Sequence, residues 1–84
     1  MKENIRELIK ALKKIRGESA DISISHKLYG KQKLRCIFSP IINERIGFNI
    51  NEQSIYIDRQ NVQRIYLKDY ICFADDVMEI KIEV

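Results

Sequence analysis

The hydrophobic period of this chain changes once, near Gly17, and that change limits the fold more than any other feature. Before it, apolar residues recur at intervals of three or four positions, namely Ile5, Leu8, Ile9, Leu12 and Ile15. This spacing lines one side of an amphipathic α-helix, which we predict over about residues 3–16. From about residue 21, apolar and polar residues alternate in short runs, which is the period of a β-strand. The expected order is one helix followed by strands.

The alternating runs predict six to seven short strands between about residues 21 and 84. In the clearest run, inward residues alternate with charged outward ones: Met78, Ile80, Ile82 and Val84 against Glu79, Lys81 and Glu83. Pro40 is expected to end the second strand, because proline cannot donate a ladder hydrogen bond. Every connection is short, so we expect consecutive strands to pair as an antiparallel meander.

These elements predict a single α+β domain that spans residues 1–84. The helix is expected to pack on the meander or to cap it, and the sheet to close as a small barrel or to bend strongly. We favour these two forms because short strands with frequent turns leave few long edges. The order of a helix followed by short strands is similar to that of small SH3-like and Sm-like barrels. The likeness concerns order alone and carries no family motif.

Composition narrows the class of protein. The hydrophobic fraction of 45% suits a packed domain, and no apolar run approaches the roughly 20 residues that span a bilayer. We therefore expect a cytoplasmic protein without a membrane partner. Cys36 and Cys72 lack the spacing of a metal or redox motif and are expected to be small buried residues.

The sequence contains few residues in patterns typical of a catalytic site. His26 is the single histidine, and it falls on the inward phase of the first strand, opposite Ser23 and Ser25. No nucleophile and orienting group accompany it at a useful spacing. The pair Asp75-Asp76 suits a turn better than a metal site. We expect no enzymatic activity, no cofactor and no metal.

Charge is divided unevenly along the chain and suggests where a macromolecule would bind. Residues 1–35 hold ten basic and four acidic residues, or +6, while residues 36–84 hold five basic and eight acidic residues, or −3. A basic helix face and a basic first hairpin provide long-range attraction, and outward tyrosines among cations could stack on bases or anchor a protein. The candidate binding residues are Arg6, Lys10, Lys13, Lys14, Lys31, Lys33, Arg35, Tyr56, Arg64 and Tyr66.

Three functional hypotheses follow. The first is a small binding protein that regulates or inhibits a protein partner, in the manner of a phage or mobile-element accessory protein that acts on a host protein; the abundance of Ile, Lys and Asn fits an AT-rich genome. The second is a small β-barrel that binds RNA or single-stranded DNA through the basic helix and first hairpin. The third is a structural subunit that completes its core by forming a homo-oligomer.

Overall fold

A computed structural model describes residues 4–84 and confirms a small α+β fold with one α-helix and antiparallel strands. The elements, in chain order, are α1 (Asn4–Lys14), β1 (Ser19–His26), β2 (Gly30–Ile37), β3 (Pro40–Ile42), β4 (Arg45–Ile50), β5 (Gln53–Asp58), the 3-10 turn η1 (Arg59–Asn61), β6 (Arg64–Tyr66), β7 (Ile71–Ala74) and β8 (Met78–Glu83). The helix ends at Lys14, two residues before the predicted end, and Gly17 follows with a φ of 85°. Its predicted start at residue 3 lies outside the described residues.

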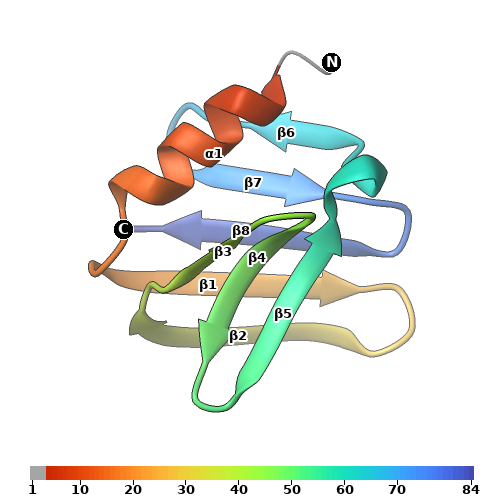
Figure 1. The fold of residues 1–84 in the computed structure, drawn as a ribbon. Coiled ribbons are helices and arrows are strands. Elements are labelled where there is room, and N and C mark those ends of the chain that lie inside the picture. Colours follow the sequence, from red (N-terminus) through yellow and green to blue (C-terminus); the bar gives the residue numbers. More distant parts are fainter. Residues whose placement is uncertain (1–3) are drawn as a thin grey trace.

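The eight strands form two sheets stacked as layers (Figure 1). The larger sheet has the order β2-β1-β8-β7-β6, and the smaller has the order β3-β4-β5. Helix α1 and the smaller sheet lie side by side on the same face of the larger sheet, with α1 over β6 and β7. The other face of the larger sheet has no layer over it among residues 4–84.

Most consecutive strands pair antiparallel as the predicted meander requires, but two connections depart from it, and residues 4–84 do not close into a barrel. β2 does not pair with β3, and β5 does not pair with β6; instead β1 lies between β2 and β8. Apolar patterns indicate the inward face of each strand but do not identify its neighbour, so alternation within a strand does not predict the pairing of β1 with β8.

The second strand ends at Ile37, before Pro40, as predicted, but the chain then forms a further strand that was not predicted. Pro40 begins β3, a three-residue strand that the alternation did not reveal. Proline is tolerated there because it is the first residue of a strand at the edge of its sheet, where its missing N–H costs no essential ladder bond.

The core fills the space between the two layers. Leu8 and Leu12 of α1 are fully buried, as are Phe48 of β4 and Ile80 of β8. The inward series at the last strand is confirmed at Ile80 and Ile82, while Met78 is half-buried and packs against the core. The inward assignment fails at Val84, which is 67% exposed at the end of β8; Leu28, which continues the apolar alternation of β1 into the following turn, is 79% exposed.

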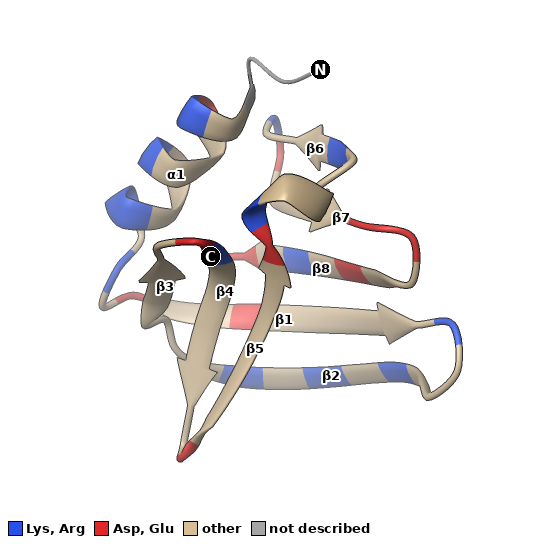
Figure 2. Ribbon diagram, turned by 45° about the vertical axis from the view of Figure 1, so that its right-hand side comes forward, with Lys and Arg blue, Asp and Glu red and all other residues tan. Residues whose placement is uncertain are grey.

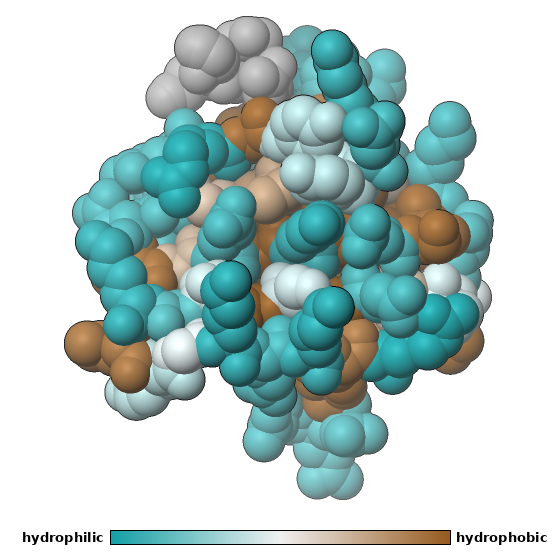
Figure 3. All heavy atoms as spheres, turned by 180° about the vertical axis from the view of Figure 1, so that it is seen from behind, coloured by the Kyte–Doolittle hydropathy of each residue, from teal (hydrophilic) through white to brown (hydrophobic). Residues whose placement is uncertain are grey.

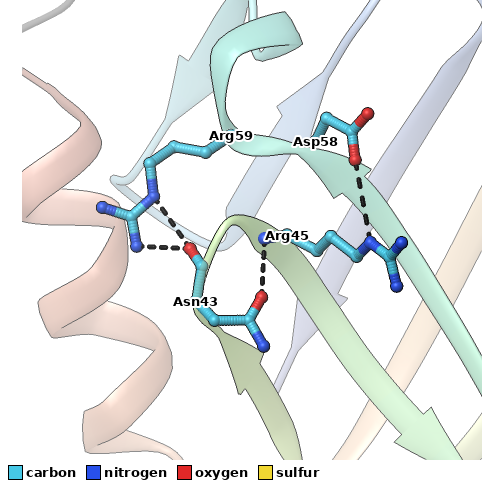
Figure 4. Close-up of polar contacts among 4 residues, drawn as sticks. All are labelled: Asn43, Arg45, Asp58 and Arg59. Carbon is cyan, nitrogen blue, oxygen red and sulfur yellow. Dashed lines mark hydrogen bonds and ion pairs between the residues drawn. The ribbon is translucent and has the colours of Figure 1, made fainter.

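Hydrogen bonds stabilise the turn between β3 and β4 of the smaller sheet (Figure 4). Arg59 donates from Nε and Nη2 to the Asn43 carbonyl oxygen at 3.0 and 2.6 Å, and Asn43 Oδ1 accepts the Arg45 backbone N–H at 2.7 Å. Gly47 in β4 allows the backbones of β4 and β5 to approach closely, because a Cβ there would collide with the Ile55 carbonyl oxygen. The turn and the close approach together fix the face that β4 and β5 present outward.

Candidate binding surface

The uncovered face of the larger sheet presents polar side chains in register across the strands; we call it the open face. One row crosses all five strands: Lys33, Ser23, Lys81, Cys72 and Tyr66. A second row runs beside it: Lys31, Ser25, Glu79, Ala74 and Arg64. Neighbouring strands are about 4.8 Å apart, so each row is roughly 19 Å long. Figure 3 looks at this side of the molecule and shows a mainly hydrophilic surface.

Small side chains in the middle of the open face make a shallow groove of about 740 Å³. Ser23 and Ser25 of β1 lie along its floor, with Lys31 and Lys33 of β2 on one side. Across the groove, Tyr70, Cys72 and residues of β8 complete the lining. Three lysines and one carboxylate, that of Glu79, line the groove, so its net charge is positive and suits an anionic ligand.

An aromatic pair lies at the far side of the groove. The rings of Tyr66 and Tyr70 are 4.6 Å apart between centroids, and Lys81 Nζ lies 4.3 Å from the Tyr70 centroid. The Tyr66 hydroxyl donates to Asp69 at 3.3 Å. The cation–π contact holds the Lys81 ammonium in the middle of the sheet, while Tyr66 remains 37% exposed.

The cations on β2 differ in their partners. Arg35 forms an ion pair with Asp21 at 2.6 Å, directly across from it on β1. Lys31 and Lys33 lie opposite serines on β1, and neither forms an ion pair within residues 4–84. Figure 2 shows the basic positions at intervals along β2. The positive charge of Lys31 and Lys33 is thus available to a partner.

Cys72 is a poor nucleophile on the open face. Its thiol donates to Glu79 Oε2 at 3.2 Å. Partial burial and the nearby Glu79 carboxylate raise the pKa of Cys72 to about 12 from an ordinary value of 9.0. Since the thiolate is the reactive form, the group is neutral and unreactive near neutral pH.

The open face brings together five of the ten predicted binding residues, namely Lys31, Lys33, Arg35, Arg64 and Tyr66. The basic helix residues Arg6, Lys10, Lys13 and Lys14 are exposed on α1, which covers the opposite face of the same sheet. The basic helix and the basic hairpin therefore do not form one continuous surface.

Tyr56 belongs to a third surface, the outward side of β5. The Arg45 guanidinium lies 4.6 Å from its ring centroid, and Arg45 also approaches Asp58 at 4.0 Å. Tyr56 is 36% exposed and is separated from the Tyr66–Tyr70 pair by the core. It does not share a site with them.

Sequence reasoning missed several residues that now lie with the predicted ones. Lys81 was assigned an outward position but no role, and Tyr70, Ser23, Ser25 and Cys72 were not placed near a cation. The pairing of β1 with β8 brings them together, and no short-range signal reports that pairing.

Strand β2 also has exposed apolar residues at both ends. Leu28 and Tyr29, in the turn before β2, are 79% and 83% exposed, and Ile37 at its last position is 62% exposed. They are among the most exposed large hydrophobic residues of the structure. Together with Lys31 and Lys33 they define the β2 surface, a basic centre with apolar ends.

His26 supports the turn at the start of this surface. Its Nδ1 accepts the backbone N–H groups of Leu28 and Tyr29 at 3.0 and 3.4 Å, and its ring lies 4.6 Å from the Tyr29 ring. The Nδ1 lone pair is therefore engaged by the turn. Ser23 and Ser25 project from the other face of β1, as the alternation predicts.

The acidic residues near the end of the chain have structural partners. Asp75 Oδ1 accepts the backbone N–H groups of Val77 and Met78 at 2.9 and 2.8 Å, and Asp76 accepts from Gln63 Nε2 at 2.6 Å. The predicted turn at Asp75-Asp76 is confirmed. Within residues 4–84, no three metal-ligating side chains gather as a cation site would require. In the same part of the chain, no helix is long and apolar enough to cross a membrane.

Comparisons with known proteins add no relative. No family model, no curated protein and no solved structure matches this chain.

Proposed function

We propose that this is a non-enzymatic binding protein that regulates or inhibits a partner protein through the β2 surface. The observation that carries the proposal is the arrangement of this surface: Leu28 and Tyr29 at one end, Ile37 at the other, and uncompensated lysines between them. Large apolar side chains left exposed next to one edge strand are typical of interaction surfaces, and tyrosine is enriched among the residues that anchor interfaces.

The charges of the β2 surface suit an acidic partner. Lys31 and Lys33 have serines as their cross-strand neighbours, so their attraction for an approaching carboxylate is not cancelled locally. Charge complementarity of this kind speeds association and excludes partners of like charge. Apolar contacts at the two ends would supply the desolvated area that gives affinity.

Site-specific photocrosslinking tests this proposal. Tyr29 and Tyr56 are each replaced by p-benzoylphenylalanine in cells that produce the protein, and adducts are separated by mass. The expected result is a discrete protein adduct from position 29 and none from position 56, because Tyr56 lies on the outward side of the smaller sheet. Adducts from position 56 alone, or equal adducts from both, would overturn the proposal.

The open face favours a second candidate function, the binding of single-stranded nucleic acid. Lys33, Lys81 and Tyr66 occupy one row across the sheet, so cations for phosphates and an aromatic ring for a base lie on one surface. The test is fluorescence anisotropy with a short oligouridine. Lys33→Glu with Lys81→Glu should make the slope of log affinity against log salt shallower by about 0.7 for each lost phosphate contact.

The matched control is Lys13→Glu with Lys14→Glu, which changes the same charge on α1, across the sheet from the open face. It should leave the slope unchanged. Equal loss in both variants would indicate a nonspecific response to net charge and would remove the nucleic-acid candidate.

A further inference from the structure

We infer that β2 accepts an extended segment of the partner as an additional strand of the larger sheet, and that this segment alternates acidic and apolar residues. The inference rests on the proposed function for the statement that the β2 surface binds a protein. It adds the mode of binding and the chemistry of the partner.

The backbone of β2 provides the template. β2 is the outermost strand of the five-stranded sheet and spans eight residues, whereas β6 at the opposite edge spans three. In an antiparallel pair, alternate residues direct their N–H and C=O groups away from the neighbouring strand. The outer side of β2 therefore offers a row of backbone groups long enough to hold another strand.

Side chains on the open face select for acidic residues in the added strand. Lys31 and Lys33 occupy alternate positions and face the same side. A strand paired outside β2 would place its own alternate side chains directly beside them. Opposite charges in such cross-strand positions stabilise a sheet, and like charges destabilise it.

Side chains on the other face of β2 select for apolar residues. Leu34 and Cys36 alternate with the basic residues and lie at the border of the core, where both are half-buried. An added strand would cover their remaining exposed area with its own alternate side chains, and burial of apolar area favours association. The added strand should therefore carry acidic residues at every second position, facing Lys31 and Lys33, and apolar residues at the positions between them, facing Leu34 and Cys36.

The same charges make a second copy of this chain a poor occupant. Two copies of β2 could pair antiparallel with their open-face side chains on the same side. In the central registers of such a pair, Lys33 would lie opposite a lysine or arginine of the other copy. Basic side chains on an edge strand are a known barrier to such self-association. The edge of the sheet at β2 therefore disfavours pairing with a second copy of β2 and favours pairing with an acidic strand.

Amide exchange tests the inference directly, because only strand addition forms new backbone hydrogen bonds along β2. The probe is a synthetic peptide of alternating Glu and Val with the length of β2, added to 15N-labelled protein. Alternate amides within residues 31–37 should become protected from exchange by at least tenfold. A peptide of alternating Lys and Val should give no protection, and a Glu/Val peptide with a central proline should give less.

A charge swap sharpens the test. Lys31→Glu with Lys33→Glu should bind the Glu/Val peptide about tenfold more weakly and should gain affinity for the Lys/Val peptide, since two cross-strand pairs change sign. Lys13→Glu with Lys14→Glu, the control on α1, should leave the preference unchanged. A folded charge-swap variant with the wild-type preference would overturn the inference.

The outcomes separate this inference from the function on which it rests. Peptide binding without amide protection, protection at β5 or β6 instead of β2, or equal protection by all three peptides would each overturn strand addition. A protein adduct from position 29 would still support the β2 surface as the contact site in those cases. No adduct from position 29, combined with protection of β2 by the acidic peptide, would overturn the proposed function and leave strand addition as a property of the edge.

Discussion

The two faces of the five-stranded sheet are built from the same strands and have opposite chemistry. On the covered face, one row across all five strands reads Gln32, Ile24, Ile80, Phe73 and Ile65. On the open face, the adjacent row reads Lys33, Ser23, Lys81, Cys72 and Tyr66. Four of the five covered residues are apolar, whereas the open row has two lysines and a serine.

The difference shows how a small chain separates its packed core from a polar surface. Adjacent residues on a strand point to opposite faces, so one residue can fill the core while its neighbour meets solvent. A single domain of 84 residues has a small core, and each buried apolar residue on the covered face contributes a large share of its stability. Residues on the open face do not fill the core, so they can be charged, whereas an unpaired charge in a packed interior would be strongly destabilising.

The largest expected effect compares two neighbours on β7. Phe73 is fully buried, and Phe73→Ala should lower the free energy of unfolding by about 3–5 kcal/mol. Cys72→Ala, on the open face, should lower it by less than about 1 kcal/mol. Urea unfolding of both variants measures the contrast. Equal losses would mean that the two faces do not differ in their contribution to the core.

The next comparison concerns the helix that covers one face. Leu12 is fully buried, and Leu12→Ala should lower the free energy of unfolding by about 2–5 kcal/mol. Lys13→Ala is the control, because Lys13 is exposed and surface substitutions usually change stability by less than about 0.5 kcal/mol. A denaturation midpoint unchanged by Leu12→Ala would show that α1 is peripheral to the core.

The third prediction concerns the thiols, one on each face of the sheet. The pKa of Cys72 is raised to about 12 by partial burial and by Glu79. In Cys36→Ser protein, where Cys72 is the remaining thiol, Glu79→Gln should speed alkylation near pH 8, because each unit by which the pKa falls gives about tenfold more thiolate. An unchanged rate would show that Glu79 does not control this thiol.

The raised pKa of Cys72 also makes the free energy of unfolding depend on pH. The folded state holds its proton to higher pH than the unfolded chain, which releases it near pH 9. This group therefore contributes stability that is fully present below about pH 9 and is lost as the pH rises toward 12. Cys72→Ser should flatten the alkaline limb of stability against pH, and Cys36→Ser is the matched control.

The smallest effect is expected at the ion pair on the open face. Arg35 and Asp21 are 2.6 Å apart, but their side chains are 64% and 59% exposed. Exposed pairs of this kind contribute about 0–1 kcal/mol and are screened by salt. Arg35→Ala should change the free energy of unfolding by no more than this amount, with a smaller change in high salt. A loss comparable to that of Leu12→Ala would show that the open face helps to hold the fold.

The sequence predicted the elements better than their arrangement. Periodicity located α1, the first hairpin, the β4–β5 hairpin and the inward series at Ile80 and Ile82, because each depends on local alternation. It missed β3, where Pro40 hides a short edge strand, and it missed the pairing of β1 with β8. Strand partners distant in sequence are chosen by packing of the whole chain, which a local pattern does not encode.

The candidate surface was predicted in part for the same reason. Outward positions such as Lys33 and Tyr66 follow from alternation within one strand. That they share a row with Lys81 follows only from the order of strands in the sheet. Tyr56 has the same local pattern and lies in the other layer, so alternation alone could not exclude it.

The central position of β8 in the larger sheet affects how the chain folds during translation. β8 joins the β1–β2 hairpin to β7 and β6, so the larger sheet stays in two pieces until residues 78–83 have been synthesised. Ribosomes add about 5–20 residues per second, so the edge of β1 that pairs with β8 stays unpaired for seconds after β1 has been synthesised. Such late, long-range pairing predicts slow folding and a dependence on chaperones during translation.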